Sequence, residues 1–277
     1  MVRRILLATD LTAGSDRAFD RAAQLARTPG VALKIFHAVD TNLLLPRFAK
    51  QELQDAKARL ALEIRDATDR SLKVVAEVAS GDPDTAIVEA AKATRSDLII
   101  IGSADYRGLS AALRGTTVDR VVRAAPCPVL VVKVRPRRDY ASIVVAVDTG
   151  APSRRALEFA LRLFPGARFD IVHIDETSGD ARPTRGAKQD IRRSIDEVVR
   201  FACEAAHRPP PGEPGGPKLV IANGSARELL QKEIEAREPD LVVIGTHARK
   251  GVSKLFLGSV AEALLARLRC DMLVARA

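Results

Sequence analysis

Short apolar runs alternate along this chain with longer segments whose apolar residues recur at helical spacing. Within residues 3–9, Ile5–Ala8 form a continuous apolar run, whereas residues 15–27 carry Ala18, Ala22 and Ala26 at intervals of one helical turn. A short apolar run bounded by turn residues is typical of a buried strand, and the longer period is typical of an amphipathic helix. Apolar strands that alternate with helices favour a parallel sheet covered on both faces.

The same pattern predicts five strands and four helices in each half of the chain. In the first half the strands are expected at 3–9, 31–39, 72–79, 97–102 and 127–134, and the helices at 15–27, about 48–70, 84–95 and 116–124. In the second half the strands are expected at 142–148, 167–174, 218–222, 240–245 and 270–275, and the helices near 153–163, 187–206, 225–237 and 259–268. Right-handed crossovers then give an α/β fold with two Rossmann-like, doubly wound domains, each with a five-stranded parallel sheet.

The two halves are also similar residue by residue. Ile5–Asp10 resembles Ile143–Asp148, Lys34–His37 resembles Asp170–His173, Asp97–Gly102 resembles Asp240–Gly245, and Cys127–Val132 resembles Cys270–Ala275. The separation stays near 140 residues and the order is kept, which indicates a tandem duplication. A polar stretch with a helix-breaking proline, Pro136, lies between the copies. We therefore predict one domain at 1–138 and a second at 139–277.

Composition narrows the class of protein. Of 277 residues 47% are hydrophobic, which is enough to bury a core and excludes a fully disordered chain. The three cysteines are far apart in sequence, which excludes a disulfide scaffold and a multi-thiolate zinc site, and Cys127 and Cys270 are expected in the core. Because no apolar run approaches the roughly 18 residues of a membrane helix, we expect a soluble, cytoplasmic protein without a membrane partner.

The net charge of +9 raises the alternative of a nucleic-acid partner, since a basic surface binds phosphates. The basic residues of the helices are interleaved with Asp and Glu, which favours a solvated surface instead. A separate stretch, 209–217, is almost wholly Pro and Gly, and we expect a mobile surface loop there.

Candidate chemistry lies after the fourth strand of the second half. Gly245 ends that strand, and Gly258-Ser259 directly precedes the last helix. In a doubly wound sheet ligands bind beyond the carboxyl ends of the strands, and a helix N-terminus favours a phosphate. A Walker P-loop and a G-x-G-x-x-G motif are both absent. An ordinary strand–loop–helix connection remains the alternative on these residues alone.

The spacing in this loop resembles a known family. Gly245-x2-Ala248-x9-Gly258-Ser259 resembles the G-x2-G-x9-G-(S/T) nucleotide loop of the universal stress proteins, and the first half repeats the spacing from Gly102 to Thr116. This resemblance covers nearly the whole chain, twice. It implies stress-responsive binding or signalling proteins with a Rossmann-like domain, of which one branch binds ATP and another does not.

The resemblance also assigns site residues. In the second half they are Ala146, Asp148, Ile174, Gly245, His247, Ala248, Arg249, Gly258, Ser259 and Val260. In the first half they are Ala8, Asp10, Ala38, Gly102, Gly115, Thr116 and Thr117. Asp105 stands where the family has its second glycine, and a carboxylate there would repel phosphates. We therefore expect the second half to hold the better site.

These observations predict a module that binds ATP, ADP or AMP together with Mg²⁺, with slow ATP hydrolysis if any. No catalytic residue and no metal ligand set of the protein is identified. We expect His37 and His173 to have a structural role, the two domains to pair through their last strands, and the protein to form a homodimer. The alternative is a nucleotide-free dimerisation scaffold for protein partners.

Overall fold

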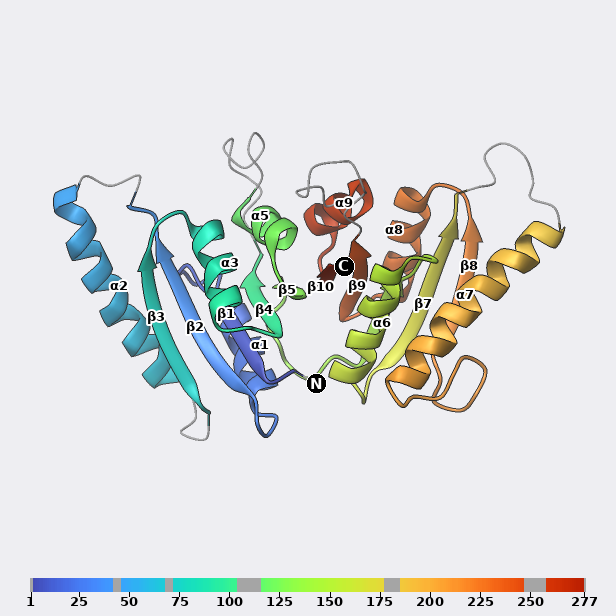
Figure 1. Ribbon diagram of the computed structural model, residues 1–277, viewed down its shortest axis with the longest axis horizontal. Coiled ribbons are helices and arrows are strands. Elements are labelled where there is room, and N and C mark those ends of the chain that lie inside the picture. Colours follow the sequence, from blue (N-terminus) through green and yellow to red (C-terminus); the bar gives the residue numbers. More distant parts are fainter. Residues whose placement is uncertain are drawn as a thin grey trace. The chain divides into compact units, whose positions relative to one another are not determined.

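The computed structural model describes residues 2–41, 46–67, 72–103, 116–176, 185–246 and 258–276. The chain divides into two compact units, Val2–Arg137 and Arg138–Ala277. Each unit is a five-stranded parallel sheet with helices in its crossovers, as the hydrophobic pattern predicts (Figure 1).

The first unit has its strands in the order β3-β2-β1-β4-β5. Its strands are β1 (Arg4–Ala8), β2 (Ala32–Val39), β3 (Val74–Ser80), β4 (Leu98–Gly102) and β5 (Val129–Val132). Its helices are α1 (Asp16–Ala26), α2 (Pro46–Ala67), α3 (Pro83–Ala93) and α5 (Thr117–Ala124). The observed β5 is shorter than the expected strand at 127–134.

The second unit repeats this order as β8-β7-β6-β9-β10. Its strands are β6 (Ser142–Ala146), β7 (Arg168–Asp175), β8 (Lys218–Asn223), β9 (Leu241–Thr246) and β10 (Asp271–Arg276). Its helices are α6 (Ala151–Leu163), α7 (Arg185–Ala205), α8 (Ala226–Arg237) and α9 (Ser259–Arg267). Helix α6 packs against α7, and α8 packs against α9. Right-handed crossovers place these two pairs on opposite faces of the sheet.

The central strands are buried because helices cover both of their faces. The first four residues of β4 and of β9 are buried, and Ile143, Val144 and Val145 of β6 are inaccessible to solvent. The outer strands β3 and β8 consist of exposed or half-buried residues. The sheet centre therefore supplies the core, and its carboxyl edge lies beside the loops that carry the candidate chemistry.

In each unit an aspartate accepts hydrogen bonds from the backbone at the start of the first strand. Asp97, just before β4, accepts hydrogen bonds from the backbone N–H groups of Arg3 and Arg4, both at 2.9 Å. Asp240, just before β9, accepts from the N–H groups of Ala141 and Ser142 at 2.8 and 3.0 Å. Each carboxylate thereby joins the first strand of its unit to the fourth.

The structure corrects one local expectation, for the two cysteines, and adds two details, for Ser15 and for the stretch 209–217. Ser15 stands at the N-cap of α1 but makes no side-chain capping hydrogen bond, because its hydroxyl donates to Asp10 instead. Cys127 and Cys270 are half-buried rather than core residues. The stretch 209–217 forms hydrogen-bonded turns, in which Glu213 N–H donates to the Pro210 carbonyl and Gly216 N–H donates to the Glu213 carbonyl.

Candidate functional site

A cavity of about 420 Å³ lies at the carboxyl edge of the second sheet. This volume falls in the range of small-molecule pockets. Residues from the ends of β6, β7 and β9 and from the N-termini of α6, α8 and α9 line it: Ala146, Val147, Asp148, Ser153, Val172, Ile174, Glu176, Ala226, Leu230, Ile244, Gly245, Thr246, Gly258, Ser259, Val260 and Ala261. It lies where the strand order reverses between β6 and β9, the position at which doubly wound sheets bind ligands.

The cavity brings together most of the residues that the sequence assigns to the second half. Ala146, Asp148, Ile174, Gly245, Gly258, Ser259 and Val260 all line it. His247, Ala248 and Arg249 lie outside the described residues. The sequence assignment missed Glu176, which follows β7 and lines the cavity beside Val172 and Ile174, two alternate residues of that strand.

The Asp148 carboxylate is held in place by its own loop. Its Oδ1 accepts a hydrogen bond from the Gly150 N–H at 2.8 Å and another from the Ser153 hydroxyl. The Asp148 N–H in turn donates to the Ser153 hydroxyl oxygen at 3.1 Å. Ser153 is 2% exposed, whereas Asp148 is exposed, so the hydroxyl that holds the carboxylate is buried while the carboxylate itself remains accessible. The loop thus presents an oriented carboxylate, which can accept hydrogen bonds from a ligand's hydroxyl groups.

Gly245 is required by packing against α6. A Cβ atom at this position would lie 2.5 Å from the Ser153 Cα and 2.6 Å from the Pro152 carbonyl carbon. The family resemblance assigns this glycine to the nucleotide loop. The structure shows that the backbone at the start of α6 occupies the side-chain space, and this contact brings Ser153 to the cavity.

The N-terminus of α9 opens into the cavity with glycine as its N-cap. Gly258 has a φ of +92°, a left-handed value that favours glycine, and the helix has no side-chain capping hydrogen bond. The first N–H groups of a helix lack intrahelical acceptors and carry the positive end of the helix dipole. Together with the Ser259 hydroxyl, this end of the cavity suits an anion such as a phosphate.

The N-terminus of α8 enters the same cavity but is capped by a carboxylate. Glu176, which follows β7, accepts a hydrogen bond from the Ala226 N–H through Oε1 at 2.9 Å. The N-termini of α8 and α9 therefore differ, because the Glu176 carboxylate caps α8 and a glycine caps α9.

The first half repeats the loop after its first strand. Asp10 Oδ1 accepts hydrogen bonds from the Thr12 N–H at 3.0 Å, the Thr12 hydroxyl at 2.6 Å and the Ser15 hydroxyl. Burial alone would raise the pKa of Asp10, but these hydrogen bonds outweigh burial and lower it below its usual value. Ala8 ends β1, Ala38 lies in β2 and Gly102 ends β4, while Gly115 and Asp105 lie outside the described residues.

The start of α5 differs from the start of α9. Thr116 and Asp119 form a capping box: the Thr116 hydroxyl accepts from the Asp119 N–H at 3.1 Å, and the Asp119 carboxylate accepts from the Thr116 N–H at 2.8 Å. Both residues are buried, and Thr117 is the first helical residue. A buried carboxylate thus occupies the helix end that the sequence assigned to a phosphate. The sequence pattern Thr116-x-x-Asp119 carries this signal.

The two strand-end histidines have matching structural roles, as expected. His37 Nδ1 donates to the Thr9 carbonyl, and His173 Nδ1 donates to the Val147 carbonyl, each at 2.8 Å. Each ring ties the end of the second strand to the end of the first strand of its unit.

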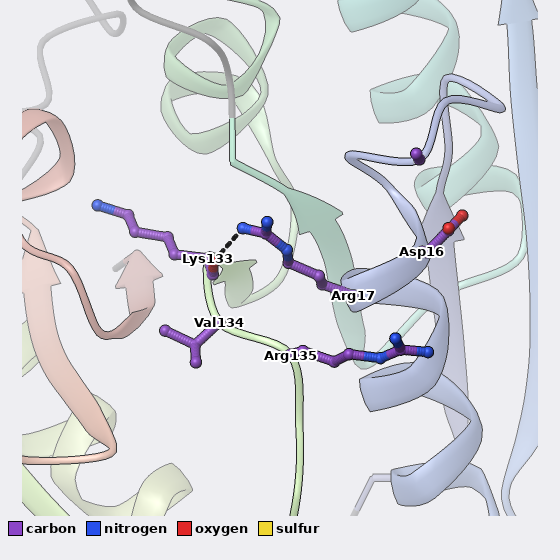
Figure 2. Close-up of a pocket in the computed structure, with 6 residues that line it drawn as sticks. Asp16, Arg17, Lys133, Val134 and Arg135 are labelled. Carbon is purple, nitrogen blue, oxygen red and sulfur yellow. Dashed lines mark hydrogen bonds between the residues drawn. The ribbon is translucent and has the colours of Figure 1, made fainter.

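A second cavity, of about 460 Å³, lies in the first half at α1 and the segment after β5 (Figure 2). The Arg17 guanidinium donates to the Lys133 carbonyl at 2.8 Å, and Arg135 pairs with Asp20 at 3.1 Å. Of its lining residues, Ala13, Asp16, Arg17, Lys133, Val134 and Arg135, none is a predicted nucleotide ligand. Arg17 and Arg135 thereby connect α1 to the segment that follows β5.

Neither a metal cluster nor a membrane span is found in the described part of the chain. There, no three His, Cys, Asp or Glu side chains are grouped so that they could hold a metal ion. Among the same described residues, no helix combines the length and apolar character that crossing a membrane requires.

Comparison with known sequences gives two matches to one family. The sequence model of the Universal stress protein family matches residues 1–133 and again residues 139–276. The universal stress protein Rv2005c of Mycobacterium tuberculosis is 28% identical over 225 residues, which cover 75% of this chain and 70% of the relative. The universal stress protein MJ0531 of Methanocaldococcus jannaschii is 28% identical over 150 residues, 50% of this chain and 86% of the relative.

Solved structures share the fold over nearly the whole chain. A universal stress protein from Archaeoglobus fulgidus superposes with a TM-score of 0.71 at 19% identity, covering 99% of this chain and 96% of the other. Protein PA1789 from Pseudomonas aeruginosa, described as functionally unknown, gives 0.68 at 23% identity, with 99% and 92% covered. These similarities support the tandem α/β architecture.

Proposed function

The chain belongs to the universal stress protein family, and from this premise we propose that its second half binds ATP or a related adenine nucleotide, ADP or AMP. In this proposal the protein acts as a binding or signalling module in the stress response. Binding changes a conformation or a partner surface, and any hydrolysis of ATP is slow. The sequence has only three cysteines, which are far apart, and this is consistent with a reducing compartment such as the cytoplasm.

One observation carries the proposal: a single cavity joins an oriented carboxylate to a glycine-capped helix N-terminus. Asp148 lies at the end of β6, and Gly258-Ser259 begins α9. A nucleotide presents the matching groups, hydroxyls on its ribose and negative charge on its phosphates. The apolar side chains of Val172, Ile174 and Leu230 in the same cavity suit a planar base.

We assign roles accordingly. The base packs on β7, the ribose hydroxyls donate to Asp148, and the phosphates accept from the first N–H groups of α9 and from Ser259. Mg²⁺ accompanies the nucleotide through its phosphate oxygens, since magnesium is commonly held by substrate phosphates and water.

The first half is the weaker site in this proposal. The Asp119 carboxylate already caps α5, so a phosphate there would meet a buried negative charge. This asymmetry is independent of Asp105, from which the sequence predicted the same outcome.

Two experiments test the proposal. Mass spectrometry of the small molecules released by denaturing the purified protein should detect ATP, ADP or AMP. Calorimetry with Mg²⁺-ATP should show binding to the wild type that Gly258→Val abolishes, because a side chain at the α9 cap blocks the phosphates.

Gly212→Val is the matched control for that variant. Gly212 has a φ of +90°, and a Cβ atom there, as at Gly258, would have no neighbour within 4 Å, but Gly212 lies in the Pro/Gly turn. The two variants therefore carry similar backbone strain, and Gly212→Val should bind ATP normally. Wild-type affinity in Gly258→Val would refute the site, and absence of binding in the wild type would favour the nucleotide-free scaffold.

A further inference from the structure

Strand β7 and the residue that follows it present three side chains to the cavity. Val172, Ile174 and Glu176 all line it. Asp175, between the last two, is buried and accepts a hydrogen bond from the Asn223 side chain at 3.0 Å. Val172 and Ile174 share one face of β7 because they are alternate residues of the strand, and Glu176, which follows the strand, lines the same cavity and ends this apolar wall with a carboxylate.

The order of strands fixes which part of a bound nucleotide lies near Glu176. Across the sheet the order is β7-β6-β9, and α9 follows β9 in the chain. With phosphates at α9 and ribose at Asp148 after β6, the base lies over the end of β7. Among the described residues that line the cavity, Glu176 is the charged side chain at that end, so it faces the base rather than the phosphates.

The position of the Glu176 carboxylate is also defined. Its Oε1 accepts from the Ala226 N–H at 2.9 Å, and Ala226 lines the same cavity. That bond uses one oxygen and orients the other. An ionised carboxylate can only accept hydrogen bonds. It is therefore matched to an exocyclic amine, such as the N6 group of adenine, and mismatched to the O6 carbonyl of guanine or hypoxanthine.

We propose that Glu176 is the residue that selects the base, favouring a purine with an amine at its 6-position over one with a keto group. The inference rests on the proposed nucleotide function and assigns a specificity determinant to the same site. It predicts discrimination between two ligands that differ only at that position of the ring and its adjacent nitrogen.

The test is calorimetric titration of the full chain with Mg²⁺-ATP and Mg²⁺-inosine triphosphate. The wild type should bind ATP at least about tenfold more tightly. In Glu176→Gln the ratio of the two affinities should fall by about tenfold, because the glutamine amide can donate to the keto oxygen. Glu228→Gln is the matched control. Glu228 lies in the first turn of α8, the helix that Glu176 caps, but it does not line the cavity. This variant should therefore keep the wild-type ratio of affinities.

Several outcomes would overturn the inference. The wild type could bind both nucleotides equally, or the ratio of the two affinities could stay unchanged in Glu176→Gln. Either result would mean that Glu176 only caps α8, although the nucleotide site itself would still be supported. A ratio that falls equally in Glu228→Gln would attribute the effect to the charge of α8. Failure of the wild type to bind either nucleotide would reject the proposed function and this inference with it.

Discussion

A serine and an aspartate form the same pair after the first strand of both halves. In each half the serine hydroxyl donates to the aspartate Oδ1, and the aspartate N–H donates back to the hydroxyl oxygen, for Ser15 with Asp10 and for Ser153 with Asp148. The sequence identified the aspartates through the family resemblance. It did not identify the serines, because the bond depends on how the turn folds back onto the strand end.

Removing the serine hydroxyl should loosen the carboxylate. We expect Ser153→Ala to lower stability by about 1–2 kcal/mol and to weaken ATP binding roughly fivefold or more, since a hydrogen bond to a charged group is lost. Thermal unfolding and calorimetry measure the two effects. Ser15→Ala should cost similar stability yet leave ATP binding in the second half unchanged, and an equal loss of affinity in both variants would contradict the assignment.

Two equivalent glycines should respond differently to substitution. A Cβ at Gly245 would lie 2.5 Å from backbone atoms of Ser153, whereas a Cβ at Gly102 would lie 3.5 Å from its nearest neighbours. We expect Gly245→Ala to lower the free energy of unfolding by about 2–3 kcal/mol through overpacking, and Gly102→Ala to be nearly neutral. Denaturant unfolding compares them, and equal stabilities would show that α6 moves freely away from β9.

The N-termini of α5 and α9 show that the capping-box sequence pattern does not by itself determine which residue caps a helix. Thr116-x-x-Asp119 and Ser259-x-x-Glu262 both fit the capping-box pattern. The structure forms the box at α5, whereas α9 has Gly258 as its N-cap. The elements themselves were predicted well because hydrophobic periodicity reports burial directly. The cap depends on the path of the preceding loop, which periodicity does not encode.

This difference predicts opposite effects of two similar substitutions. Thr116→Ala should destabilise the first half by about 1 kcal/mol, the usual value of an N-cap side chain, without affecting ATP binding in the second. Ser259→Ala should leave stability within about 0.5 kcal/mol and weaken ATP binding several-fold, because its exposed hydroxyl serves the ligand. Unfolding curves and calorimetry on both variants decide, and a reversed pattern would contradict the assigned roles.

Asp97 and Asp240, which accept hydrogen bonds from the backbone at the start of the first strands, should make the free energy of unfolding depend on pH. Burial alone would raise the pKa of Asp240, but hydrogen bonds from the N–H groups of Ala141 and Ser142 and from Arg138 outweigh burial and lower it. The same balance, with N–H groups and Arg4 as donors, lowers the pKa of Asp97. A carboxyl with a lowered folded-state pKa stabilises the fold above its unfolded value of about 4, and this contribution is lost as the pH falls through the folded value.

Asp240→Asn should therefore lower the free energy of unfolding by about 1 kcal/mol at pH 7. The variant's free energy of unfolding should also fall less steeply than that of the wild type between pH 5 and pH 2. Denaturant unfolding over that range provides the measurement. Asp196→Asn is the control, since Asp196 forms a surface pair with Arg200 within one helix turn, and surface pairs contribute little. An Asp240→Asn decline as steep as that of the wild type would mean that other carboxyls control the acid response.

At the scale of the whole chain, duplication gives two copies of one fold. The copies differ at the carboxyl edge of the sheet, where the candidate site lies. The order of the motifs predicted both domains, and the chain divides into units at Arg137 and Arg138. The expected asymmetry in nucleotide binding was inferred from Asp105 and stays a prediction, which the Asp119 cap of α5 supports independently. Pairing of the two domains and homodimer formation stay predictions.

Calorimetric titration of the full chain with Mg²⁺-ATP tests the central claim most directly. We predict one nucleotide per chain, with affinity reduced at least about tenfold by Asp148→Ala and unchanged by Asp10→Ala, because the carboxylate of the second half contacts the ligand. Two equal sites, or a single site lost in Asp10→Ala and kept in Asp148→Ala, would contradict the assignment of nucleotide binding to the second half.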